Sequence, residues 1–164
     1  MFELKPLSRE GIPKALEKAE RYRLLNEPGE SESICLDILR IDPENQPALV
    51  MLLLARTDQF ERSAVSVSQA REVLPRLHDE YDRAYYAGII CERRAKALAH
   101  SGPGAERVAY DWFLEAMGWY EKGEAIRPAG NDDALLRWNT CARILMRNPH
   151  MRPVSEERSE PPLE

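Results

Sequence analysis

The sequence has no surplus of basic residues and no long apolar run. It carries 28 acidic and 23 basic residues, for a net charge of −5, whereas a nucleic-acid-binding domain concentrates Lys and Arg. The longest apolar run, residues 48–55, is far shorter than the ~20 residues that a membrane-spanning helix needs. The first residues, Met-Phe-Glu-Leu-Lys-Pro, lack the basic start and apolar core of a secretory signal. We therefore expect a cytoplasmic protein with no nucleic-acid partner and no membrane partner.

Cysteine and histidine are scarce, and none of them is spaced as a metal ligand. The cysteines lie far apart and form no Cys-x-x-Cys pair, so neither a zinc site nor a disulfide framework is predicted. We expect the cysteines to be small core residues and the histidines to be solvated. The residues are Cys35, Cys91, Cys141, His78, His100 and His150. The sequence therefore predicts no metal and no cofactor.

Catalytic motifs are also absent. No Gly-x-Ser-x-Gly motif, phosphate-binding loop or dinucleotide fingerprint occurs. The acidic segment 78–82 lacks the alternating ligands of a calcium loop and fits better as the first turn of a helix, where acidic side chains complement the helix dipole. The glycine-rich segment 101–104 follows no predicted strand and fits a turn between helices. We therefore expect a protein that is not an enzyme.

What the sequence does contain is helical periodicity along most of its length. The fifth and sixth predicted helices each span roughly 22 residues, or ~33 Å, so this pair should extend about three turns beyond its neighbours. The segment 148–164 is rich in proline and charge and is predicted to be disordered, which leaves a helical domain over residues 8–147. The seven predicted helices cover residues 12–26 (with a possible start at Ser8), 30–41, 46–57, 61–74, 79–100, 105–126 and 132–147.

A small or apolar residue followed by four residues and a proline recurs at the ends of predicted helices. The three instances are Ile38-x4-Pro43, Ala70-x4-Pro75 and Gly123-x4-Pro128. The first two prolines, Pro43 and Pro75, are 32 residues apart. This interval is close to the period near 34 residues that is typical of stacked helical hairpins. Such hairpins bury their apolar faces only against neighbouring hairpins. The recurrence therefore favours an all-helical binding scaffold over an enzyme.

Around these prolines the sequence resembles the tetratricopeptide repeat family. The first helix of that repeat follows Trp-x2-Leu-Gly-x2-Tyr, and its second helix follows Ala-x3-Phe-x2-Ala-x4-Pro. The first-helix spacing occurs in Ala84-x2-Ala87-Gly88-x2-Cys91, in Ala15-x2-Lys18-Ala19-x2-Tyr22 and, less well, in Leu49-x2-Leu52-Leu53-x2-Arg56. The second-helix spacing occurs in Ser31-x3-Cys35-x2-Ile38-x4-Pro43, in Ser63-x3-Val67-x2-Ala70-x4-Pro75 and in Ala116-x3-Tyr120-x2-Gly123-x4-Pro128.

The resemblance implies a fold and a binding surface. The fold would be an all-α, right-handed superhelix of about three helical hairpins, the third elongated, followed by a C-terminal helix. In this family the first helices of the hairpins line a concave groove that binds a peptide or a helix of another protein. Carried over by position, the groove residues are Leu16, Glu20, Arg23, Val50, Leu54, Tyr85, Ile89, Glu92 and Arg93, to which the seventh helix would add Leu135 and Asn139.

This lining excludes one known kind of partner and leaves three functions open. It lacks the lysine and asparagine pair with which chaperone-binding members hold a C-terminal carboxylate. The first function is an interaction scaffold or adaptor. The second is a bacterial secretion chaperone, which would hold an unfolded client segment in the groove. The third is self-assembly into a homodimer through the elongated hairpin, whose sixth helix carries the aromatic residues Tyr110, Trp112, Phe113, Trp119 and Tyr120.

Overall fold

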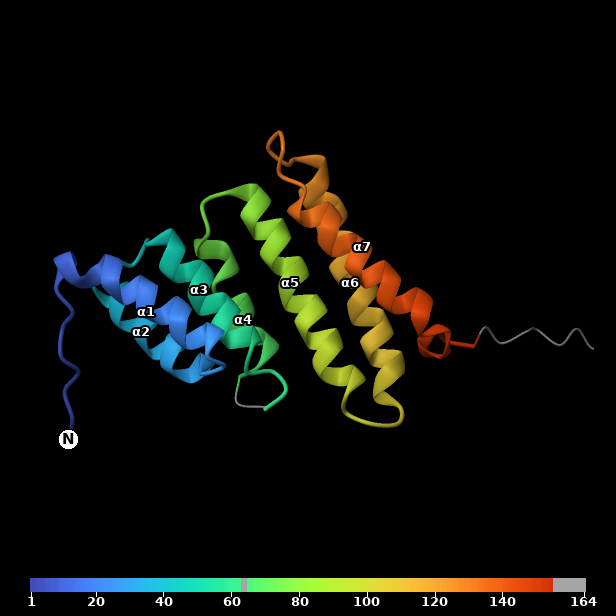
Figure 1. The fold of residues 1–164 in the computed structure, drawn as a ribbon, viewed down its shortest axis with the longest axis horizontal. Helices are drawn as coiled ribbons and strands as arrows, with labels where there is room; N and C mark the ends of the chain where they lie inside the picture. Colours follow the sequence, from blue (N-terminus) through green and yellow to red (C-terminus); the bar gives the residue numbers. More distant parts are fainter. Residues whose placement is uncertain (63–64, 155–164) are drawn as a thin grey trace, which may run out of the picture.

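The computed structural model describes residues 1–62 and 65–154, and within these residues every regular element is a helix. Figure 1 shows the helices following one another along the molecule, from α1 and α2 at one end to α6 and α7 at the other. The predicted all-α fold with seven helices is thus confirmed. The helices are α1 (Ile12–Leu24), α2 (Pro28–Ile41), α3 (Gln46–Thr57), α4 (Val67–Arg71), α5 (Glu80–Ala99), α6 (Ala105–Ala125) and α7 (Asp133–Arg147), with 3-10 turns at Arg9–Gly11, Leu74–Arg76 and Pro149–Met151.

Proline and asparagine set the starts of the first three helices. Pro13, Pro28 and Pro47 each occupy one of the first two helical positions, where the missing N–H costs no hydrogen bond. Asn45 caps α3, since its side chain accepts a hydrogen bond from the backbone N of Ala48 at 2.9 Å. The helices then pack in chain order, α1 on α2 and α2 on α3.

The fourth helix is much shorter than predicted. The sequence predicted a helix over residues 61–74, but α4 covers only Val67–Arg71 and the chain continues into the 3-10 turn Leu74–Arg76. Ser66 fixes the start of α4 through a capping box with Gln69, and this cap competes with an earlier helix start. Pro75 prevents α-helical continuation, because the residue before a proline avoids the α region. Residues 63 and 64 of the predicted helix lie outside the described residues.

The long hairpin of α5 and α6 is confirmed, with a turn at the glycine-rich segment 101–104. Its two helices approach closely at Gly88. A Cβ atom at this position would lie 2.4 Å from Cε1 of the Tyr120 ring, a distance that real Cβ contacts do not reach. Gly88 therefore has a packing role, because the absence of a side chain lets the Tyr120 ring lie directly against α5.

Two clusters of buried apolar side chains form the core, and α5 contributes to both. The first cluster lies among α1 to α5 and the second among α5, α6 and α7. Partly buried Leu54 and Tyr86 pack against both clusters. The largest fully buried apolar side chains are Ile38, Leu49, Leu52, Leu53, Leu77 and Ile90 in the first cluster, with Phe113 and Tyr120 in the second.

The cysteines and the histidines lie as the sequence predicted, and His78, His100 and His150 are all exposed. The cysteines are free and buried. Burial, with a smaller contribution from Glu32, raises the pKa of Cys35 to about 12, so its thiol stays protonated at neutral pH. The side chains of His78 and His150 are largely exposed, each near a glutamate.

The ordered chain extends past the predicted domain boundary at residue 147. Pro149–Met151 forms a 3-10 turn, and the side chain of Met151 is only 5% exposed against the second core cluster. This first part of the predicted tail thus packs on the core through Met151. Residues 155–164 of the predicted tail lie outside the described residues.

Candidate functional site

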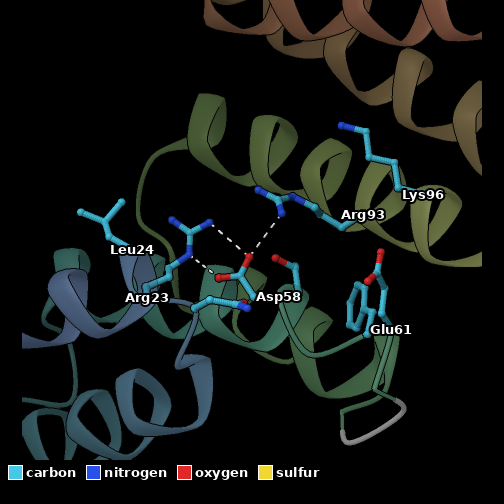
Figure 2. A pocket seen from close by; sticks show the side chains of 9 residues that line it. Arg23, Leu24, Asp58, Glu61, Arg93 and Lys96 are labelled. Atoms are coloured by element: carbon cyan, nitrogen blue, oxygen red, sulfur yellow. Dashed lines mark hydrogen bonds and ion pairs between the residues drawn. The ribbon is translucent and has the colours of Figure 1, made fainter.

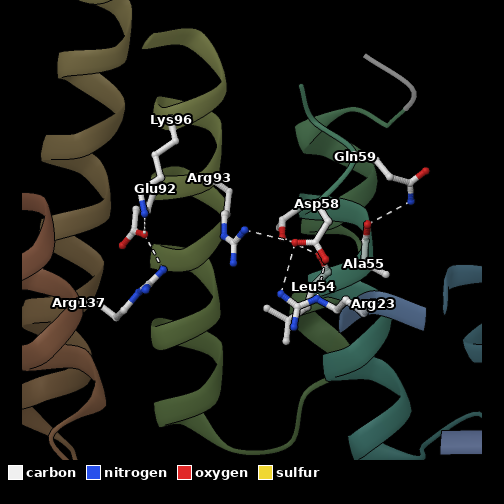
Figure 3. Close-up of polar contacts among 10 residues, drawn as sticks. Arg23, Leu54, Ala55, Asp58, Gln59, Glu92, Arg93, Lys96 and Arg137 are labelled. Carbon is white, nitrogen blue, oxygen red and sulfur yellow. Dashed lines mark hydrogen bonds and ion pairs between the residues drawn. The ribbon is translucent and has the colours of Figure 1, made fainter. Parts of the chain in front are cut away.

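Charged side chains from helices that are not consecutive in the chain meet in a row across α1, α3, α5 and α7. Arg23 comes from α1, Asp58 caps the end of α3, and Arg137 comes from α7. Figure 3 shows how the row runs from Arg23 through Asp58 to α5 and on to Arg137. We call it the charged strip, and it consists of Arg23, Asp58, Glu92, Arg93, Lys96 and Arg137.

Asp58 joins three helices. Arg23 approaches it with two nitrogens, Nε at 2.6 Å from Oδ2 and Nη2 at 3.3 Å from Oδ1. Arg93 Nη1 donates to the same Oδ1 at 3.3 Å. The Asp58 side chain is only partly exposed, so these charge-assisted bonds are less screened than those of a surface pair. The ends of α1 and α3 are thereby held against the middle of α5.

Glu92 is the second carboxylate of the strip, and its side chain is 0% exposed. Lys96 Nζ donates to Oε2 at 2.8 Å, and Arg137 Nη2 donates to the same oxygen. The other oxygen, Oε1, accepts from the Tyr120 hydroxyl at 3.0 Å and faces the Cys141 Sγ at 3.4 Å. A buried carboxylate is tolerated only when it is paired and hydrogen-bonded in this way. The network ties α5 to both α6 and α7.

The donors around Glu92 keep their protons. Burial raises the pKa of the Tyr120 phenol, and the nearby Glu92 charge raises it further. Burial followed by the Glu92 charge also raises the pKa of the Cys141 thiol. Both groups therefore donate toward the carboxylate across the physiological pH range. The network around Glu92 thus combines fixed charges with neutral donors, an arrangement that suits a structural or a binding role.

A recess of about 440 Å³ lies beside the Asp58 end of the strip. Figure 2 shows the side chains of Arg23, Arg93 and Lys96 around it, with Glu61 at its rim. Leu24 adds an exposed apolar side chain. The recess therefore combines cations with apolar surface; its lining residues are Arg23, Leu24, Asn26, Thr57, Asp58, Phe60, Glu61, Arg93 and Lys96.

Tyrosine rings occupy α5 on the N-terminal side of the strip. Tyr85 stacks on Tyr81 at 5.9 Å between ring centroids and meets Tyr86 edge-on at 5.0 Å. Its ring also lies 6.0 Å from that of Tyr120. Burial, followed by the charge of Asp82, raises the pKa of Tyr86 to about 12. The partly exposed rings of Tyr85 and Tyr86 thus offer neutral, rigid contact area of the kind that binding surfaces use.

Comparisons with protein-family models, curated proteins and solved structures found no match for this chain. The resemblance to tetratricopeptide repeats therefore stays a prediction. In the part of the chain that the structure describes, no group of three or more His, Cys, Asp and Glu side chains could hold a metal ion. No helix of that part is both long enough and apolar enough to cross a membrane.

The predicted groove residues divide into two sets. Most are accessible: Glu20 is exposed, while Leu16, Arg23, Val50, Leu54, Tyr85 and Arg93 are partly exposed. Two are not. Ile89 is 4% exposed and Glu92 is 0% exposed, so the expectation that they line an open groove is wrong. The physical reason is that α6 and α7 cover this side of α5, with Tyr120 and Arg137 lying directly over Glu92.

The predicted groove residues did not include Asp58, Lys96 or Arg137, although the sequence contains a signal for two of them. Glu92 and Lys96 are four residues apart on one helix, a spacing at which opposite charges meet. Asp58 is separated by 35 residues from Arg23 and by 35 residues from Arg93. This interval is close to the ~34-residue period of helical hairpins, so a search for charges at the repeat period would have found the triplet. Arg137 has no comparable signal.

Proposed function

We propose that this chain is a non-catalytic interaction scaffold of the cytoplasm with a tetratricopeptide-like, right-handed superhelical arrangement of hairpins. Its binding surface would be the face formed by α1, α3, α5 and α7, and its ligand a peptide or helix of another protein. The observation that carries the proposal is the charged strip, in which Asp58 gathers side chains from α1 and α5. The part of the strip formed by Arg23, Asp58 and Arg93 is partly exposed, and a surface built from alternate helices is the kind that stacked hairpins use for binding.

Two further features of the face support a binding role. The recess beside Asp58 provides room for a side chain of a ligand. The partly exposed rings of Tyr85 and Tyr86 provide apolar contact area. Aromatic and arginine side chains are enriched among the residues that contribute most to protein–protein binding.

Site-specific photo-crosslinking tests the proposal. A benzoylphenylalanine at Tyr85 is expected to cross-link a partner protein in cells, because this position lies on the proposed face. The matched control places the same group at Leu36, which is 43% exposed on α2. Equal cross-linking from both positions, or none from Tyr85, would contradict the proposal. A captured segment that is unfolded without this chain would favour the chaperone function, and a folded partner would favour the adaptor.

Self-association is a second candidate, and one observation favours it. Leu114 and Met146 are 44% and 78% exposed beside an apolar recess between α6 and α7. Of the sixth-helix aromatics, Phe113 and Tyr120 are buried in the core, so they are not free for a second copy. Light scattering of the wild type and a Met146→Asp variant tests this candidate. A dimer that is lost in the variant would support it, and a concentration-independent monomer would exclude it.

A further inference from the structure

The charged strip has a local surplus of positive charge, although the chain as a whole is acidic. Asp58 is shared by two guanidinium groups, those of Arg23 and Arg93. Glu92 is likewise shared by Lys96 and Arg137. Each carboxylate therefore faces two cations, which leaves positive charge uncompensated within a chain of net charge −5. The recess itself is lined by three of these cations and by the carboxylates of Asp58 and Glu61, so one positive charge is in excess there, and an excess of this sign attracts anionic groups of a ligand.

Arg93 is held less tightly than its neighbour Arg23. Its single contact with Asp58 measures 3.3 Å, and its side chain is 35% exposed. Its Nε–H has no acceptor among the residues that the structure describes. Arg23, by contrast, bonds both oxygens of Asp58. Arg93 can therefore turn toward an incoming carboxylate while Asp58 keeps its bidentate partner.

Lys96 lies one helical turn from Glu92 and donates a hydrogen bond to its carboxylate. Its side chain is 35% exposed and lines the recess together with Arg93. Glu92 would remain bonded to Arg137 and Tyr120 if the Lys96 ammonium turned toward a ligand. Arg93 and Lys96 thus form a pair of partly exposed cations on α5, and neither carboxylate partner depends on them alone.

The recess also has an apolar side. Leu24 is 77% exposed at its edge, and Phe60 lies in its wall. An exposed leucine beside two cations is complementary to a ligand segment in which apolar and acidic side chains are close neighbours. Glu61 lines the same recess and would repel an acidic ligand, so its removal should strengthen binding.

We propose that this recess binds an acidic segment of a partner protein. A carboxylate of the segment would lie between Arg93 and Lys96, and an apolar side chain would contact Leu24. This inference rests on the proposed function, because it names the class of segment that the same face would bind. Charge complementarity of this kind sets partner choice and association rate.

Fluorescence anisotropy with labelled peptides tests the inference on the full chain. The probes are a short amphipathic peptide of leucine and glutamate and its analogue with glutamine in place of glutamate. We expect the wild type to prefer the acidic probe and to lose that preference at high salt, because salt screens exposed charges. In an Arg93→Gln/Lys96→Gln variant, affinity for the acidic probe should fall about tenfold, as two exposed ion pairs would contribute.

Two controls separate this effect from misfolding and from bulk charge. A Lys18→Gln/Arg40→Gln variant removes the same charge at exposed positions that do not line the recess, and it should bind like the wild type. A Glu61→Gln variant should bind the acidic probe roughly twofold more tightly, since a repulsive charge is removed. Circular dichroism melting curves establish that each variant is folded.

The possible failures are distinguishable. Equal binding of the acidic and glutamine probes would overturn the acidic segment and leave the interaction scaffold standing. No binding of either probe, combined with no cross-linking from Tyr85, would contradict both. The chain also carries Glu156, Glu157, Glu160 and Glu164. If the acidic probe binds only after these four residues are changed to glutamine, the recess is occupied by the chain's own acidic residues. That result would overturn the proposal that the recess binds a segment of a partner protein.

Discussion

At the scale of single residues, Glu92 joins three helices through a fully buried carboxylate. It lies on α5 and accepts hydrogen bonds from Tyr120 on α6 and Arg137 on α7. Its carboxylate has no access to solvent, so its bonding partners replace the water that it has lost. A charge held in this way costs little while the network is complete and much when one member is missing.

We predict that Glu92→Gln lowers the free energy of unfolding by about 2–3 kcal/mol. This is less than the ~3–5 kcal/mol typical of a broken, fully buried pair, because Lys96 and Arg137 are partly exposed and can turn to water. Urea unfolding followed by circular dichroism measures the change. The matched control is Glu61→Gln at an exposed position, which should stay within about 0.5 kcal/mol of the wild type. Equal effects of both variants would contradict the role given to burial.

At the scale of helices, the contact between α5 and α6 depends on one residue without a side chain. The Tyr120 ring packs directly against Gly88, where a Cβ atom would collide with it. At Gly118 on α6, by contrast, nothing lies within 4 Å of the position of a Cβ atom. Alanine is intrinsically a better helix former than glycine by about 1 kcal/mol. The two glycines therefore separate helix propensity from packing.

We predict opposite effects for the two glycine-to-alanine substitutions. Gly88→Ala should destabilise the protein by about 1–3 kcal/mol, because the added methyl group forces the Tyr120 ring or the helices apart. Gly118→Ala should stabilise it by up to about 1 kcal/mol, since only the helix propensity changes. Thermal melting of the two variants beside the wild type gives the sign directly. A shift of both melting temperatures in the same direction would show that the close contact at Gly88 does not limit packing.

The sequence predicted most helices but not how deeply their faces are buried. Prolines and glycines mark helix ends directly, as at Pro43 and in the turn 101–104, because they change the allowed backbone conformations. Ser66 was missed as the start of α4, since its cap competes with a helical pattern that begins earlier. The resemblance to tetratricopeptide repeats likewise assigned Glu92 to the groove face of α5, but it holds no information on how α6 and α7 cover that face. The depth of a side chain depends on contacts between distant segments.

At the scale of the whole molecule, α3 and α5 connect two cores. Leu54 packs against both clusters of buried side chains, and Asp58 lies one turn further along the chain. All tryptophans, Trp112, Trp119 and Trp138, are partly buried and pack against the second cluster. Tryptophan fluorescence therefore reports on the C-terminal half, whereas circular dichroism reports on all helices.

We predict that Leu54→Ala separates the unfolding of the two halves. Removal of a fully buried leucine costs about 2–5 kcal/mol, and the partly buried Leu54 should lie near the lower end of this range, with the loss at the junction between the two clusters. In the wild type, the circular dichroism and fluorescence transitions in urea should coincide, as in a cooperative domain. In the variant, the circular dichroism transition should begin at lower urea than the fluorescence transition. Coincident transitions in Leu54→Ala would mean that cooperativity passes through other contacts.

The equal spacing of Arg23, Asp58 and Arg93 has a consequence for how such a chain could grow. The three residues are separated by the same interval of 35 residues, so in the proposed repeat architecture they would occupy equivalent positions in successive units. Duplication of one such unit within the gene would add another charged side chain to the same row and keep the register of the rest. Deletion of a few residues inside a unit would instead rotate every later member out of line. To keep the row aligned, such a chain would gain or lose whole units more readily than it would gain or lose single residues within a unit.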